Sequence, residues 1–200
     1  MIKTPFKRAS DWIARRYSFS LMSVLLLAAG WFFWQFNFSS LPVSNRALVK
    51  LSGHDGLLDL RLYYTAQEAF TALSHYGEAG RGLYVKFLAA DFIFIPIYSL
   101  GLGFLMTRLV RTAFHGDPRR LWLNLLPLGV GALDATENVF ILIMLGLYPN
   151  SNVLIGTLAG ITTFCKFLLT FCASLCLLYL IFMLAWHRGR PRHRGSPRAT

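Results

Sequence analysis

Three acids and one lysine of this 200-residue chain lie deep inside stretches that are otherwise long and apolar enough to cross a bilayer. Asp91 lies in the second of four such stretches, Asp134 and Glu137 lie in the third, and Lys166 lies in the fourth. A charged side chain in hydrocarbon costs about 2.5–3.5 kcal/mol on insertion scales, so such residues normally face a partner or a water-filled cavity. If the chain has a working site, we therefore expect it among these residues.

The spacing of these residues predicts which of them share a level. Asp134, Glu137 and Asn138 stand at i, i+3 and i+4, so they occupy one stripe of a helix. At the helical rise, Asp91 lies about 12 Å from the start of its stretch, and Glu137 and Asn138 lie about 15 Å from the end of theirs. Asp134 and Lys166 share a deeper level, at about 20 Å.

One lysine cannot neutralise three acids. An ion pair between Asp134 and Lys166 would cancel two charges and would fix which helices meet. Asp91 and Glu137 must then be protonated, hydrated through a cavity, or paired with a basic residue near the start of the second stretch. Two such carboxyls are suited to proton transfer or to binding a cation.

The intramembrane acids, Asn138 and Lys166 together are called here the polar layer, and a tyrosine extends it. Tyr98 lies two positions beyond Pro96, which removes one helix hydrogen bond and leaves a backbone acceptor available. Its hydroxyl can therefore reach the same layer. No residue is assigned a catalytic role. Asp134 and Lys166 are predicted to form a structural ion pair, and the residues predicted to bind a ligand are Asp91, Tyr98, Glu137 and Asn138.

The composition predicts an all-α, polytopic membrane protein. Hydrophobic residues make up 55% of the chain, and they concentrate in residues 18–38, 83–107, 121–147 and 153–186. A spanning helix needs about 20 mostly apolar residues. Backbone in lipid must satisfy its own hydrogen bonds, which segments of this length do as helices. We therefore predict a four-helix transmembrane bundle, formed by residues 1–186 as a single domain.

The positive charges predict the orientation of this bundle. The net charge is +11, and the basic residues gather before the first span, between the second and third spans, and after the fourth. These three regions fall on one side, which the positive-inside rule makes cytoplasmic. We expect a cell (inner) membrane protein with both termini cytoplasmic, an outer loop at residues 39–82 and a basic, disordered tail at residues 187–200. Basic residues divided among span flanks do not indicate nucleic-acid binding.

The outer loop carries its own helical signals. Residues 44–51 have a short helical pattern. Thr65 and Glu68 have the spacing of a capping box, which predicts an amphipathic helix at residues 66–76. Gly77 is a plausible stop for that helix. We expect it to lie along the outer membrane surface or to cap the bundle.

Other motifs narrow the chemistry. Cys165, Cys172 and Cys176 share one face of the fourth span, and the chain has no other cysteine, so they indicate packing rather than a redox pair. Gly156 and Gly160 form a small-xxx-small pair that allows another helix to approach the outer part of the fourth span. The histidines lack the spacing of metal ligands, and no phosphate loop or dinucleotide fingerprint occurs. We predict no metal and no cofactor.

Between Tyr64 and Lys166 the chain combines several short motifs: Gly77–Glu78–Ala79–Gly80–Arg81 with Tyr84, Asp91 with Pro96 and Tyr98, Leu126–Pro127–Leu128, and Asp134–Ala135–Thr136–Glu137–Asn138. Together they resemble a group of small four-span prokaryotic membrane proteins. This resemblance covers about half the chain, and it implies that the polar layer is a shared feature without implying a reaction.

A second resemblance is more distant. Residues 92–98, with an acid just upstream, look similar to the second span of the sigma-2 receptor and emopamil-binding-protein family. These are membrane proteins of four or more spans with acids inside the bundle, and they bind sterol-like amines. No functional position of that family is carried over to this chain.

Three classes of function remain open. The first is binding of a small amphiphilic or lipid-like ligand in an outward-facing acidic pocket built by the second, third and fourth spans. The second is a membrane enzyme that uses Asp91 or Glu137 as acid or base on a lipid substrate. The third is a structural or accessory subunit. The expected partners are membrane lipid and a small amphiphile, with a homo-oligomer as a further option and no nucleic acid.

Overall fold

Seven α-helices and two short 3-10 helices form the chain in the computed structural model, which describes residues 5–39, 42–115 and 117–189. No strand occurs in these ranges, and four helical segments are long and apolar enough to cross a membrane. The all-α membrane bundle is thus confirmed. Its four long helices are α2 (Phe19–Phe38), α5 (Gly77–Ala113), α6 (Leu126–Leu147) and α7 (Val153–Gly189).

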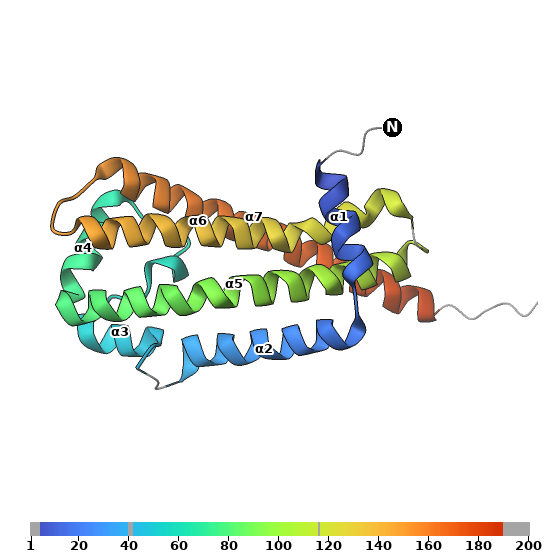
Figure 1. Cartoon of the computed structure of the whole chain (residues 1–200), viewed down its shortest axis with the longest axis horizontal. Helices are drawn as coiled ribbons and strands as arrows, with labels where there is room; N and C mark the ends of the chain where they lie inside the picture. The colour runs from blue at the N-terminus through green and yellow to red at the C-terminus, as the bar shows by residue number, and fades with distance from the viewer. Residues whose placement is uncertain (1–4, 40–41, 116, 190–200) are drawn as a thin grey trace, which may run out of the picture.

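The long helices pack in a chain of neighbours. α2 packs along α5, α5 along α6, and α6 along α7, with a smaller contact between α5 and α7. Figure 1 shows α7 crossing behind α6 toward the end where α1 lies. α2 and α7 flank this arrangement, and they expose large apolar side chains such as Leu27, Phe171 and Leu178. Faces of this kind suit a lipid environment.

The predicted spans differ from the helices by more than one residue at four ends: α5 covers Gly77–Ala113 instead of residues 83–107, α6 begins at Leu126 instead of residue 121, and α7 ends at Gly189 instead of residue 186. α5 begins at Gly77, six residues before the predicted start, because a positive φ of 61° at Gly77 turns the chain directly from one helix into the next. α7 continues to Gly189, into the predicted tail. Residues 190–200 of that tail lie outside the described residues.

Three short elements gather at one end of the bundle, called here the cap end. They are α3 (Asn45–Ser52), the 3-10 helix η1 (Leu58–Leu60) and α4 (Ala66–His75). The predicted capping box is present: Thr65 Oγ1 accepts from the Glu68 amide at 3.2 Å, and Glu68 Oε2 accepts from the Thr65 amide at 2.7 Å. α4 packs on α7 and buries Ala69, Ala72 and Leu73, so it caps the bundle.

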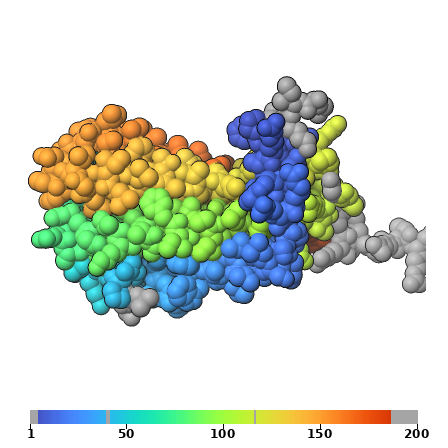
Figure 2. All heavy atoms as spheres, viewed as in Figure 1, coloured from blue at the N-terminus to red at the C-terminus, as the bar shows by residue number. Residues whose placement is uncertain are grey.

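The opposite end, called here the α1 end, holds two elements that were not predicted. α1 (Pro5–Arg16) lies across the bundle axis, and the 3-10 helix η2 (Pro118–Leu125) leads into α6. In the space-filling view, α1 covers one end of a closed face made by α2, α5 and α6 (Figure 2). α1 packs on η2 and α5 through its buried Ser10, Ile13 and Ala14.

Candidate functional site

The segment between α3 and α4 enters the bundle instead of running over its surface. We call residues 55–61 the inserted segment. Leu57 and Leu58 are fully buried, and Asp59 is 7% exposed. The Tyr84 hydroxyl on α5 holds the segment, because it accepts from the Leu58 amide at 2.9 Å and donates to Asp59 Oδ1 at 2.7 Å. The tip of a loop thereby places a carboxyl inside the bundle.

An ion pair and hydrogen bonds hold the two ends of the inserted segment. Asp55 lies 2.6 Å from the guanidinium of Arg61 and 2.6 Å from the ring of His75 on α4. Partial burial raises the pKa of Asp55, but the hydrogen bonds with His75 and Arg61 outweigh it and lower this pKa below its ordinary value. The Tyr76 hydroxyl also donates to the Gly56 carbonyl at 2.7 Å. These contacts fix the segment to α4.

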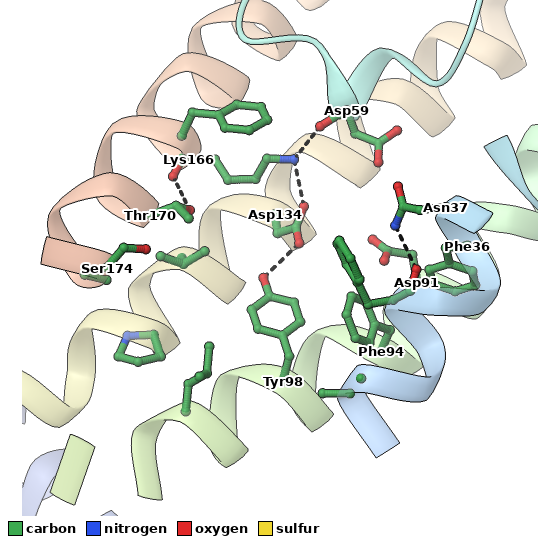
Figure 3. Close-up of a pocket in the computed structure, with 18 of the residues that line it drawn as sticks. Phe36, Asn37, Asp59, Asp91, Phe94, Tyr98, Asp134, Lys166, Thr170 and Ser174 are labelled. Carbon is green, nitrogen blue, oxygen red and sulfur yellow. Dashed lines mark hydrogen bonds and ion pairs between the residues drawn. The ribbon is translucent and has the colours of Figure 1, made fainter. Parts of the chain in front are cut away.

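Lys166 on α7 is the centre of the polar layer. Its ammonium nitrogen lies 2.5 Å from Glu137 Oε2 and 3.1 Å from Asp134 Oδ1, and it donates to the Asp59 carbonyl at 3.0 Å. Figure 3 shows the bonds to Asp59 and Asp134. Three acceptors occupy the three N–H groups of an ammonium. Lys166 therefore ties α6, α7 and the inserted segment together, with no donor left for a ligand.

Glu137 has other partners than the sequence predicted. It is fully buried, and besides the ammonium it accepts a short hydrogen bond from Thr163 on α7. We expected Lys166 to pair with Asp134 and Glu137 to stay with Asp91. Because Asp134 and Glu137 are one turn apart on the same stripe, a long lysine side chain between them contacts both. The predicted ion pair between Asp134 and Lys166 is therefore present, and Glu137 shares the same ammonium.

Asp91 and Asn138 do meet at one level. Asn138 Nδ2 donates to Asp91 Oδ2 at 2.6 Å. Asp91 lines a cavity, whereas Asn138 is fully buried and lies outside its lining. Of the four residues predicted to bind a ligand, Asp91 and Tyr98 therefore line the cavity, and Glu137 and Asn138 do not.

Tyr98 joins the two predicted groups of residues. Its hydroxyl donates to Asp134 Oδ2 at 2.8 Å, as Figure 3 shows. Asp134 and Lys166 line the same cavity, so the pair predicted to be structural also faces the space in which a ligand would lie. The polar end of the cavity thus includes Asp91, Tyr98, Asp134 and Lys166.

The cavity has a volume of about 540 Å³ and is lined by α2, α5, α6, α7 and the inserted segment. Aromatic rings surround its polar end: Phe36 lies 4.6 Å from Phe87 and 5.6 Å from Phe94 between ring centroids. The walls are mostly apolar. The remaining polar residues of the lining are Asn37, Asp59, Thr170 and Ser174.

The cavity opens differently from the expected outward-facing pocket. Asp59 and Leu60 of the inserted segment line it, so the cap end is covered. The exposed residues of its lining include Gly30 and Phe33 on α2 and Thr170 and Ser174 on α7. The opening therefore lies at the side of the bundle, between the two flanking helices α2 and α7. α2 also forms a wall, which we had not expected.

The charges of the polar layer do not balance in its ionised form. Asp134 and Glu137 contact the ammonium, whereas Asp59 and Asp91 accept hydrogen bonds from neutral groups. Burial raises the pKa of Asp59, and the nearby Lys166 ammonium and the Tyr84 hydroxyl oppose this rise without cancelling it. The layer therefore favours bound protons or a ligand that supplies hydrogen-bond donors.

Asp59 and Tyr84 were not predicted as site residues. The available signal was weak: a single acid flanked by leucines in a loop, where a charged residue would ordinarily lie in solvent. Tyr84 belongs to a motif of the first resemblance, but its partner was not apparent. Among the described residues, no group of three or more His, Cys, Asp or Glu side chains is placed to hold a metal ion.

Comparisons of the chain with family models, with curated proteins and with solved structures found no match. The function therefore has to be argued from the chemistry of the cavity and of the polar layer beside it.

Proposed function

We propose that this protein lies in the cell (inner) membrane and binds a small amphiphilic or lipid-like ligand in the side-opening cavity. The observation that carries the proposal is the cavity itself, about 540 Å³ in volume, with mostly apolar walls and a polar end. Ligand sites typically occupy about 300–1,000 Å³ and combine apolar walls with a few placed polar groups. An opening between α2 and α7 admits a ligand that already lies in the bilayer.

The polar end favours one kind of head group. Lys166 is surrounded by Glu137, Asp134 and the Asp59 carbonyl, so an anionic head would meet acceptors there instead of a donor. Asp91 accepts a hydrogen bond only from the neutral amide of Asn138 among the contacts described above. A head that donates hydrogen bonds, such as a hydroxyl or an ammonium, complements this carboxyl.

The orientation belongs to the same proposal. The α1 end carries most of the basic residues, and the positive-inside rule places such an end in the cytoplasm. The amino terminus and the end of α7 then lie in the cytoplasm, and the cap end lies outside.

A second candidate is an accessory subunit whose charges only hold helices together. The Lys166 contacts favour it, because they join α6, α7 and the inserted segment without any ligand. An enzyme acting through both Asp91 and Glu137 has less support, because Glu137 is fully buried and outside the cavity lining.

The test compares Asp91→Asn with Glu137→Gln. We expect wild-type protein purified in mild detergent to retain an amphiphile that mass spectrometry of an organic extract identifies. Asp91→Asn keeps an acceptor for Asn138 but loses the charge, so it should retain about tenfold less amphiphile at a nearly unchanged melting temperature. Glu137→Gln should mainly lower the melting temperature, because it leaves the buried ammonium of Lys166 short of a charged partner.

The matched control is Glu78→Gln, which removes an exposed acid near the start of α5. It should change neither the retained amphiphile nor the melting temperature. The proposal fails if Asp91→Asn retains as much amphiphile as the wild type. If Asp91→Asn unfolds as readily as Glu137→Gln, the accessory-subunit function is favoured instead.

A further inference from the structure

The α1 end carries a surface that the ligand cavity does not explain. Asn124 fixes α1 there, because its amide donates to the Ser10 carbonyl at 3.2 Å and to Thr107 Oγ1 at 3.1 Å. Arg111 on α5 also donates to the Ala14 carbonyl at 2.9 Å. α1 is thereby held across the bundle axis, as Figure 1 shows. In a membrane whose normal follows the long helices, α1 lies in the plane of the interface.

Three exposed arginines at this end lie over aromatic rings. The guanidinium carbon of Arg16 lies 4.9 Å from the centroid of the Trp12 ring on α1. Arg108 lies 4.6 Å from the Phe19 ring, and Arg120 lies 4.0 Å from the Phe114 ring. A guanidinium stacked on a ring keeps its N–H edge available for a phosphate. Arg120 Nε also lies 3.9 Å from Asp117 Oδ2, so only its terminal N–H groups face away from a carboxylate.

The charge of this end is strongly positive. Residues 5–18 and 108–125 contain eight basic and two acidic residues, whereas residues 42–86 around the cap end contain five basic and four acidic residues. The contrast matters because anionic lipid surfaces attract basic residues by about 1 kcal/mol each, and balanced charge gives no such attraction.

We propose that the α1 end binds the phosphate head groups of anionic phospholipids. Arg16, Arg108 and Arg120 contact the phosphates, and Trp12, 45% exposed beside them, lies at the level where aromatic side chains anchor proteins in a membrane interface. The proposal is independent of the ligand cavity, which receives no residue from α1.

The experiment measures binding of phosphatidylglycerol to the full chain in detergent by native mass spectrometry, with phosphatidylcholine as the neutral probe. We expect the wild type to bind phosphatidylglycerol in preference. The combined variant Arg16→Gln, Arg108→Gln and Arg120→Gln should weaken this binding by roughly fivefold for each arginine replaced. Added salt should reduce the preference in the wild type, because the arginines are exposed.

The matched control removes three exposed basic residues from around the cap end: Arg46→Gln, Lys50→Gln and Lys86→Gln. It should leave phosphatidylglycerol binding unchanged. Equal binding of the two lipids by the wild type would overturn the proposal, as would equal losses in the two triple variants. If the first triple variant does not fold, the single variant Arg16→Gln gives the same test, with an expected loss of roughly fivefold.

Discussion

At the scale of single residues, the polar layer depends on how one ammonium is shared. Lys166 contacts two carboxylates and one backbone carbonyl, so each partner receives a single N–H. The backbone carbonyl of Asp59 accepts a hydrogen bond from Lys166, whereas its carboxyl group accepts one from the Tyr84 hydroxyl. Burial of this carboxyl raises its pKa, and the nearby Lys166 ammonium opposes the rise without cancelling it.

Asp59 should make the protein less stable as the pH rises. A carboxyl whose pKa is raised in the folded state takes up a proton on folding, so its stabilising effect is present below the unfolded pKa of 3.8 and is lost as the pH rises through the folded pKa. Asp59→Asn abolishes this titration while it keeps an acceptor for Tyr84. The melting temperature of the wild type, relative to that of Asp59→Asn, should therefore fall from pH 4 to pH 8. The corresponding loss in the free energy of unfolding is up to about 1.4 kcal/mol per pH unit.

Asp55→Asn is the control, because it lies in the same segment and should respond with the opposite sign. The pKa of Asp55 is lowered in the folded state, so its contribution is present above 3.8 and is lost as the pH falls through the folded pKa. A difference between wild type and Asp59→Asn that does not change with pH, or that grows as the pH rises, would contradict the burial argument.

Residue types predicted part of this layer. The cost of charge in hydrocarbon singled out Asp91, Asp134, Glu137 and Lys166, and all four lie in the layer. The pairing among them was predicted only in part, because counting along helices gives depth but not the reach of a lysine side chain. Asp59 was missed because nothing in its local sequence indicates that a loop enters the bundle.

At the scale of elements, the chain at the start of α4 passes very close to α7. A Cβ at Gly160 would lie 2.0 Å from the Tyr64 carbonyl oxygen, and a Cβ at Gly156 would lie 2.8 Å from Ala66 Cβ. The predicted small-residue pair therefore does allow a close approach, though its partner is the start of α4 and not another spanning helix. This approach positions the inserted segment just upstream.

Gly160→Ala should destabilise the protein by about 1–3 kcal/mol, because backbone atoms must move to admit the methyl group. Gly82→Ala is the control: it lies within α5, and its Cβ would meet nothing within 4 Å. That change should stabilise the protein by about 0.5–1 kcal/mol through the helix preference of alanine. Both effects are measured as melting temperatures in detergent. Equal melting temperatures for the two variants would exclude the close contact.

The elements themselves follow from local signals to different degrees. The Thr65 capping box and the positive φ of Gly77 are local features, so α4 was predicted within one residue. α1 was missed because its basic residues were taken only as a flank of the first span. Its burial of Ile13 depends on η2 and α5, which lie about a hundred residues further along the chain.

At the scale of the whole molecule, the four long helices were predictable because length and apolarity alone determine that they suit a membrane. The side opening was not predictable, since it depends on the order of packing. α2 packs on α5, and α7 packs mainly on α6, which leaves the cavity between α2 and α7. The sequence gives no direct signal for which helices become neighbours.

The orientation proposed for this bundle is tested by cysteine labelling in intact cells. The native Cys165, Cys172 and Cys176 are first replaced by alanine, and a single cysteine is then introduced as His115→Cys at the α1 end or as Asn150→Cys at the cap end. Both positions are exposed. A membrane-impermeant maleimide should label Asn150→Cys in intact cells and His115→Cys only after permeabilisation, because the basic α1 end remains in the cytoplasm. The reverse pattern would place the cap end in the cytoplasm and would overturn the proposed orientation.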